Sequence, residues 1–151
     1  MMSLFKKIMI WVGSIVGAIV LLIALAFYFT SALVKPVYAQ MDAIRHGDIV
    51  KAYSYTSQDF QKVTSLTAFK QLVEDFPAIA NNKDITVTRR ELNNGLGLVD
   101  ATLTSDTGGT IQIKYQLVKE NGEWKISYLE VPATGISISK SPNNFNEKAL
   151  Q

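Results

Sequence analysis

The sequence contains no cysteine, and this absence removes several kinds of chemistry from consideration. A disulfide framework, a thiolate nucleophile, a cysteine-based metal site and a lipid anchor on cysteine are all excluded. There is one histidine, His46, so a histidine-rich metal site is excluded and a Ser-His-Asp array would have to include this residue. Oxidising and reducing compartments both accept a protein without cysteine, so the absence does not locate the chain.

The excess of positive charge is small, and it lies near the N-terminus. The 151 residues carry a formal net charge of +2. Lys6 and Lys7, the only charged residues before Lys35, account for this excess, so the remaining chain is neutral. Proteins that bind nucleic acid normally cluster lysine and arginine against the phosphates. We therefore expect no nucleic-acid partner.

Residues 8–30 contain no charged side chain and are almost entirely apolar. A helix of this length, rising about 1.5 Å per residue, spans the hydrocarbon layer of a bilayer, which is about 30 Å thick. Trp11 and Tyr28 lie near its two ends, where aromatic side chains favour the membrane interfaces. The sequence therefore predicts a single transmembrane helix at residues 8–30.

The flanking charges predict the orientation of this helix. Because Lys6 and Lys7 precede the span, residues 1–7 are expected to form a cytoplasmic tail. The protein would then lie in the inner (cytoplasmic) membrane, with its C-terminal domain periplasmic or extracellular. The alternative is a cleaved signal peptide, with cleavage near residues 24–26 or 30–32. Signal peptides usually have a shorter apolar region of about 7–15 residues, which favours an uncleaved anchor.

Gly13 and Gly17 form a G-x-x-x-G pattern within the span. Such a pattern lets two helices approach closely in lipid, so it indicates helix packing through self-association or against the helix of a partner. Small residues are also common in spans that have no such role.

Three helices are expected after the span, at residues 35–45, 49–55 and 67–76. Gly47 is a natural helix stop and Asp48 a natural N-cap, so they separate the first two helices. Residues 57–60 are interpreted as a connector, Thr67 as the cap of the third helix and Pro77 as its end.

From Asp84 the apolar period changes to two, which indicates β-strands. Four strands are expected, around residues 85–87, 99–103, 111–117 and 124–129. The turns between them, at residues 93–95, 106–109 and 120–123, are too short to connect parallel strands, so the sheet should be antiparallel. The helices are the available cover for its apolar face, which predicts an α+β domain.

Residues 132–151 are mostly small and polar, and we expect them to form a flexible tail. Ile136 and Ile138 alternate with serine, which leaves a short extra edge strand open. Phe145 could anchor a partner.

Two local patterns resemble the nuclear transport factor 2-like (cystatin-like) superfamily. They are residues 45–53 with the following Ser57 and Phe60, and the closing Glu120-Asn121-Gly122-Glu123-Trp124-Lys125-Ile126. The resemblance implies three helices packed on a curved four-stranded antiparallel sheet over residues 35–131. Within this superfamily, the chain is similar to small membrane-anchored domains of the bacterial envelope. In layout alone, the chain also looks like the single-span inner-membrane component of type IV secretion channels.

No catalytic, cofactor-binding or metal-binding residue is predicted. Enzymes of the resembling superfamily pair a buried carboxylate with tyrosine or acid donors, whereas the helical carboxylates here fall at helix ends or on polar faces. They are Asp42, Asp48, Asp59, Glu74 and Asp75. Asp100 is out of phase with its apolar neighbours, and His46 can cap a helix end. Arg89 either passes the edge of the core or marks a bulge, and a solvated strand end is favoured there over an anion site.

Aromatic residues could line a pocket for a small apolar ligand, or they could simply form the core. They are Tyr38, Tyr53, Tyr115, Trp124 and Tyr128. From these observations we expect a membrane-tethered, non-enzymatic interaction or assembly module of the bacterial cell envelope. Its expected partner is an envelope protein or a second copy of the chain. The alternative is binding of a small apolar ligand in the cone between helices and sheet.

Overall fold

The computed structural model describes residues 2–131 and 136–138 and divides the chain into two compact units, Met1–Ala32 and Leu33–Gln151. The first unit contains the N-terminal part of helix α1 (Met2–Arg45). Large apolar side chains between Ile8 and Tyr28 are 43% to 73% exposed on this helix. Within the described residues, α1 is the one helix long and apolar enough to cross a membrane.

The second unit, which we call the C-terminal domain, contains the rest of α1 and four short helices. These are α2 (Ile49–Ser54), α3 (Gln58–Val63), α4 (Leu66–Asp75) and α5 (Pro77–Ala80). The helices predicted at residues 35–45, 49–55 and 67–76 are therefore present, with shifted ends. The segment predicted as a connector, residues 57–60, is instead the start of α3. Ser57 caps this helix by accepting a hydrogen bond from the Phe60 backbone nitrogen at 3.1 Å.

The end of α1 is determined by local backbone chemistry. Gly47 adopts a φ of +74° and donates its N–H to the Ile44 carbonyl at 2.9 Å. The N–H of Asp48 donates to the Ala43 carbonyl at 2.9 Å, which completes the glycine-terminated helix end known as a Schellman motif. The Asp48 side chain then accepts from Lys51 N at 3.0 Å. The predicted stop and cap are both confirmed.

The third predicted helix differs from α4 at both ends. Ser65, rather than Thr67, is the N-cap, because its side chain accepts from the Ala68 backbone nitrogen at 3.2 Å. Pro77 ends α4 as expected but also opens α5, where proline occupies a first-turn position that needs no N–H donor.

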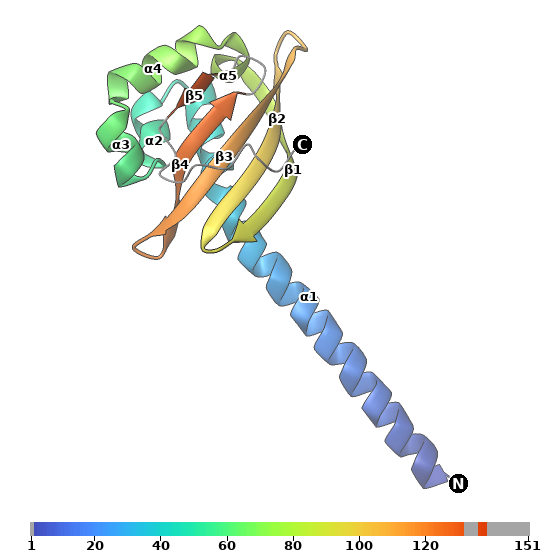
Figure 1. Cartoon of the computed structure of the whole chain (residues 1–151). Coiled ribbons are helices and arrows are strands. Elements are labelled where there is room, and N and C mark those ends of the chain that lie inside the picture. Colours follow the sequence, from blue (N-terminus) through green and yellow to red (C-terminus); the bar gives the residue numbers. More distant parts are fainter. Residues whose placement is uncertain (1, 132–135, 139–151) are drawn as a thin grey trace, which may run out of the picture. The chain divides into compact units, whose positions relative to one another are not determined.

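The sheet contains five antiparallel strands in the order β1-β2-β3-β4-β5 (Figure 1). They are β1 (Asn82–Asn93), β2 (Leu96–Ser105), β3 (Thr110–Glu120), β4 (Glu123–Val131) and β5 (Ile136–Ile138). The four predicted strands and their turns are confirmed, and β5 is the short edge strand that the sequence left open. The β1–β2 and β3–β4 turns lie at one end of the sheet, and the β2–β3 turn lies at the other (Figure 1).

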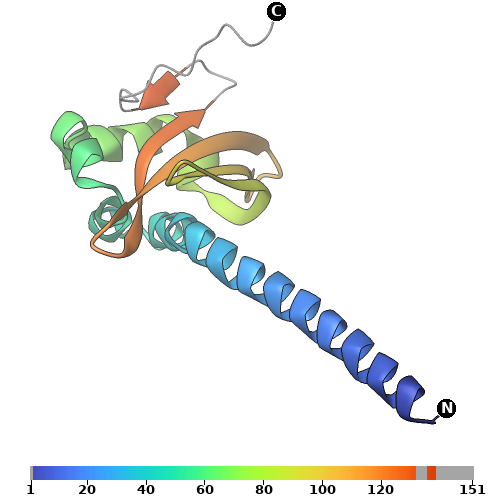
Figure 2. The ribbon, with the colours of Figure 1, turned by 60° about the horizontal axis from the view of Figure 1, so that its bottom comes forward.

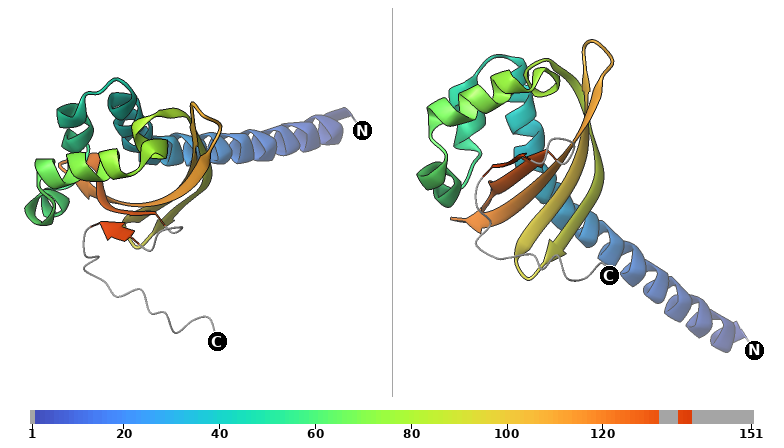
Figure 3. Two further views of the ribbon diagram at one scale, coloured as in Figure 1. Left: turned by 90° about the horizontal axis from the view of Figure 1, so that it is seen from above. Right: turned by 45° about the horizontal axis from the view of Figure 1, so that its top comes forward.

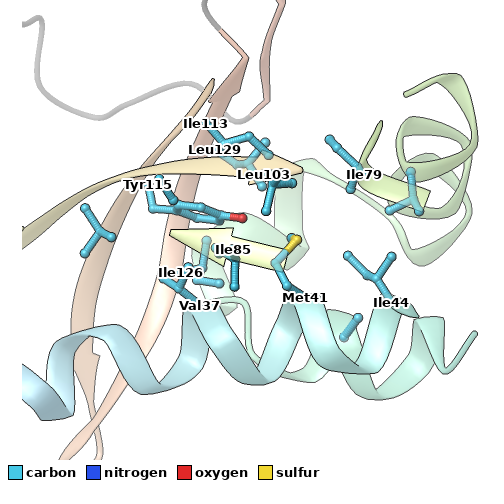
Figure 4. Close-up of a cluster of buried hydrophobic side chains, with 14 of the residues drawn as sticks. Val37, Met41, Ile44, Ile79, Ile85, Leu103, Ile113, Tyr115, Ile126 and Leu129 are labelled. Carbon is cyan, nitrogen blue, oxygen red and sulfur yellow. The ribbon is translucent and has the colours of Figure 1, made fainter. Parts of the chain in front are cut away.

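The sheet curves, with helices on its concave side (Figures 2 and 3). Alternate residues of β2 and β3 face this side, including Leu103, Ile113 and Leu117, each fully buried. Figure 4 shows Val37, Met41 and Ile44 of α1 on the side of the core that faces the sheet residues Ile85, Leu103 and Tyr115. The expected α+β class is therefore confirmed, and the arrangement is consistent with a nuclear transport factor 2-like fold.

The predicted flexible tail, residues 132–151, lies outside the described residues except for residues 136–138. These three residues pair with Leu129–Val131 as strand β5. The suggestion that Phe145 anchors a partner also falls outside the described part.

Candidate functional site

Tyr115 lies at the centre of the concave face of the sheet and is 2% exposed. Its side chain extends into the space between the sheet and α1, and its hydroxyl is directed toward the side where Met41 and Leu103 lie (Figure 4). Of the five aromatic residues considered for a pocket, it is the most deeply buried. Its surroundings are those of an apolar core.

Tyr53 of α2 packs on the edge of the same core and is held by a structural hydrogen bond. Its hydroxyl donates to the Thr64 carbonyl at 2.6 Å, which ties α2 to the end of α3. Its ring lies 5.6 Å from that of Phe69, and Phe69 in turn contacts Phe60 edge-on at 6.2 Å. Tyr53 thus joins three helices.

Trp124 of β4 is partly buried against the core, near the β3–β4 turn. The Lys119 ammonium lies 5.8 Å from the centroid of its ring, within the range of a cation–π contact. Trp124 and Tyr115 therefore share one face of the sheet but occupy different parts of it.

Tyr38 and Tyr128 lie outside this interior. Tyr38 is 42% exposed, because it lies about 100° around α1 from the buried Val37. Tyr128 pairs with Gln116, whose side chain points to the convex face because its neighbour Tyr115 points to the concave one. A β-bulge at Ser127, opposite the Gln116–Leu117 step, reverses the alternation that had placed Tyr128 with Trp124. Tyr128 therefore cannot line the cone.

Two buried side-chain polar atoms have no hydrogen-bond partner among the described residues: the Tyr115 hydroxyl and Gln40 Oε1. Gln40 is completely buried in α1, and its Nε2 donates to the Ala52 carbonyl at 3.2 Å. Buried polar atoms of this kind are uncommon, and each one lowers stability or binds a polar group from outside the chain. They are the chemically distinctive feature of the interior.

Replacing Tyr115 by phenylalanine should raise the free energy of unfolding by about 1 kcal/mol, because it removes an unpaired buried hydroxyl. Tyr53→Phe is the matched control and should lower the free energy by about 0.5–1.5 kcal/mol, since its hydroxyl is bonded. Urea unfolding at neutral pH measures both. Destabilisation by Tyr115→Phe would mean that the hydroxyl binds a polar group, such as a water or a ligand.

The same substitution should change stability at alkaline pH. Burial raises the pKa of the Tyr115 hydroxyl above its usual value of about 10. Above that pH the unfolded tyrosine loses its proton while the folded one keeps it, so the free energy of unfolding falls as pH rises. This contribution is about 1.4 kcal/mol per pH unit. Tyr115→Phe should remove it, and an identical pH dependence in both proteins would contradict the burial argument.

The polar residues weighed for catalysis lie in structural or exposed positions. His46 Nδ1 is 2.8 Å from the Asp42 carbonyl, which agrees with a role at the helix end. A bulge in β1 between Val87 and Arg89 moves Arg89 to the convex face, opposite Asp100, where it pairs with Glu91. Among the described residues no carboxylate is buried, and no three histidine or acidic residues group as metal ligands.

Gly13 and Gly17 lie in the first unit, in open space. A Cβ atom built on either glycine would meet nothing within 4 Å. Both positions are thus free to contact a second helix, and their role in packing stays a prediction.

Two structural contacts were missed by the sequence reasoning. Leu33 of α1 rests directly on Gly97 of β2, and a Cβ atom on Gly97 would lie only 2.1 Å from Leu33 Cδ1. Glycine inside a strand is the signal that indicates such a close approach. Asn82 is buried and joins three elements, since it donates to the Met41 and Ile79 carbonyls and accepts from Arg45 Nη2. No sequence signal marked it.

The fold and the apolar helix thus define a small α+β domain preceded by one possible membrane span or signal sequence. The chain belongs to the family described as a domain of unknown function, DUF4864, whose model matches residues 30–135. No curated protein matches the sequence significantly.

Among solved structures, the chain is similar to a candidate NTF2-like transpeptidase from Campylobacter jejuni. The two share 16% identity over 58% of this chain and 90% of the other, with a TM-score of 0.46. This likeness assigns no activity to the chain.

Proposed function

We propose that the chain is a membrane-tethered, non-enzymatic interaction or assembly module of the bacterial cell envelope. Residues 8–30 span the inner membrane, the N-terminus is cytoplasmic, and the C-terminal domain is periplasmic or extracellular. The partner is another envelope protein or a second copy of the chain. The observation that carries the proposal is the exposed apolar surface of α1 in the first unit.

Exposure of that apolar surface to water is energetically unfavourable, so we expect another apolar phase or molecule to contact it. Every large apolar side chain between Ile8 and Tyr28 is at least 43% exposed. Transfer of one such side chain from water to an apolar environment gains about 1.5–3 kcal/mol. The uncharged run is long enough for the hydrocarbon layer, so a bilayer is the cover that fits its length and composition.

An interaction role for the domain is supported by the free edge of its sheet. The outer side of β1 pairs with no strand among the described residues. The bulge in β1 and the exposed Arg90 oppose indiscriminate strand pairing, as edge strands of natural sheets usually do. A partner that recognises this edge must accommodate both features, which gives selectivity.

Membrane insertion can be tested by replacing Val20, Leu21 and Leu22 with arginine together. Each arginine at the centre of a span costs about 2.5–3.5 kcal/mol, so the triple variant should leave the carbonate-washed membrane fraction. The same replacement at exposed Thr86, Thr110 and Gln112 is the control and should leave the protein in membranes. Recovery of the wild-type chain in the soluble fraction would contradict the proposal.

Orientation and partnership need a second experiment on the full-length chain in cells. A reporter fused after Gln151 should be active only outside the cytoplasm. Crosslinking in membranes, followed by pull-down, should recover an envelope protein or a second copy, and Gly13→Ile or Gly17→Ile should weaken any contact made by the helix. A reporter active only in the cytosol would overturn the orientation.

The unpaired Tyr115 hydroxyl favours a second candidate function, binding of a small apolar ligand with one polar group. Such a ligand would have to enter between the sheet and α1, where the neighbouring side chains are fully buried. Lipid-like molecules bound by the purified domain, with weaker binding in Tyr115→Phe, would support this function. Binding there together with a crosslinking experiment that recovers no protein would replace the first proposal.

A further inference from the structure

The chain enters the C-terminal domain beside the β1–β2 turn. Leu33 is the first residue of the domain and is 2% exposed. Its side chain packs on the backbone of Gly97, the second residue of β2. Leu92 is the partner of Gly97 across the β1–β2 ladder. The turn that joins these strands is therefore next to the point of entry.

Chain length limits how far this turn can lie from the membrane, if residues 8–30 span it as proposed above. Ser31 and Ala32 separate Thr30 from Leu33, and the three Cα–Cα steps between them reach at most about 11 Å when fully extended. The headgroup layer extends about 5–8 Å beyond the hydrocarbon on each side. Leu33 must then lie close to the headgroup layer, which brings the neighbouring β1–β2 turn within reach of it.

The residues at this end of the sheet suit such a position. Leu92 is 58% exposed, although most large apolar residues of the domain are buried. Arg90 lies two residues before it on the same face, and Lys35 lies on α1 two residues after Leu33. Both are exposed, and neither forms an ion pair with another described residue. Their positive charges are therefore available for lipid phosphates.

The β3–β4 turn, at the same end of the sheet, carries Glu120 and Glu123, so the exposed leucine and arginine belong to the β1–β2 side of this end. The opposite end of the sheet has no such apolar and basic residues in its turn. Its turn, between β2 and β3, is Asp106-Thr107-Gly108-Gly109, with an acidic residue and no large apolar side chain. An exposed leucine together with lysine and arginine is typical of surfaces that contact the membrane interface, whereas an acidic, glycine-rich turn is not. Of these three turns, the β1–β2 turn is therefore the one whose exposed residues fit a membrane surface.

We propose that the β1–β2 end of the domain is a lipid-contacting surface. Leu92 enters the interfacial layer of the bilayer, and Arg90 and Lys35 bind the phosphates of anionic lipids. Together with the span, this surface gives the domain two attachments and holds it in one orientation on the membrane. The β2–β3 turn then faces away from the bilayer. The inference deepens the proposed function and depends on its membrane anchor.

The absence of cysteine allows a direct test, because each introduced cysteine is the only one in the chain. Leu92→Cys, Asp106→Cys and Leu21→Cys are labelled separately with an environment-sensitive fluorophore. The full-length protein is placed in vesicles of phosphatidylethanolamine and phosphatidylglycerol that carry a quencher near the headgroups or deep in the acyl chains. Leu92 and Asp106 are both exposed, so neither label should disturb the fold.

The headgroup quencher should reduce emission of the label at position 92 and leave the label at position 106 unchanged. The deep quencher should reduce emission at position 21. Equal responses at positions 92 and 106, with quenching at position 21, would overturn this inference and leave the anchor intact. No quenching at position 21 would overturn the anchor itself.

A separate experiment tests the binding of Arg90 and Lys35 to anionic lipids. Arg90→Glu combined with Lys35→Glu should lower headgroup quenching of the position 92 label in vesicles that contain phosphatidylglycerol. The same variant should change little in vesicles of phosphatidylcholine alone, which carry no net charge. Quenching that ignores both the charge reversal and the lipid charge would remove anionic lipid from the proposal.

Discussion

A chain that begins at Ser31 should fold as a soluble domain, whereas a chain that begins at Gly47 should not fold. The difference between them is the part of α1 that belongs to the core. Its buried apolar residues are Leu33, Val34, Val37, Met41, Ala43 and Ile44, none more than 8% exposed. The concave face of the sheet depends on them for cover.

The free energy lost with these side chains is large enough that the shorter chain should not fold at all. Loss of the five larger side chains forfeits about 1.5–3 kcal/mol each, or roughly 8–15 kcal/mol. A domain of ordinary stability has only about 5–15 kcal/mol in total. Circular dichroism and urea unfolding compare the two chains. A cooperative unfolding transition in the shorter chain would contradict the assignment of α1 to the core.

A matched control separates loss of packing from loss of length. In the chain that begins at Ser31, Val37→Asp with Met41→Asp places charges on the buried face of α1 and should abolish folding. Lys35→Asp with Tyr38→Asp alters the exposed side of the same helix and should leave the domain folded. Equal effects of the two pairs would mean that this helix does not pack as described.

Gly97→Ala should destabilise the domain by about 1–3 kcal/mol, because the added methyl group overlaps Leu33 and an overfilled core must shift. Gly109→Ala is the control, since its Cβ would meet only Ser105 Oγ, at 3.4 Å, and neither glycine has a positive φ. Urea unfolding of the chain that begins at Ser31 measures both. A similar loss at the two glycines would indicate a general cost of replacing glycine and not the overlap with Leu33.

A double-mutant cycle tests the contact itself. Leu33→Ala alone should cost about 2–5 kcal/mol through the cavity that it leaves. Combined with Gly97→Ala, the loss should be smaller than the sum of the two single losses, because the new methyl group occupies space vacated by leucine. Strict additivity would show that Leu33 and Gly97 do not touch.

Much of the fold followed from local patterns. The alternation Ile111, Ile113, Tyr115 and Leu117 predicted a half-buried strand, and β3 places all four on one face. Asn-Gly turns predicted tight hairpins, and Asn94 and Asn121 indeed have φ values of 49° and 50°. These features were predictable because backbone sterics and the spacing of apolar side chains act over a few residues.

Other features were not predictable because they depend on partners distant in the chain. The first turn of α3 read as a connector, since six residues are too few for a helical period. Its position is fixed by Ser57, whose N–H donates to the Ile126 carbonyl at 2.8 Å across the fold. The bulge at Ser127 reversed the side of Tyr128, and only pairing with β3 reveals an extra residue.

The features of the candidate site also fall into those that the sequence determines and those that only the tertiary structure decides. The sequence by itself determined the long apolar helix, the class of the domain, the stop at Gly47 with the cap at Asp48, and the strand alternation, because each depends on short-range periodicity and backbone chemistry. The tertiary structure alone decided that Tyr115 is buried without a partner and that Leu33 rests on Gly97. It also decided that Leu92 lies exposed where the chain enters the domain. Those facts depend on which surfaces meet when the sheet closes over α1, and no local pattern encodes that.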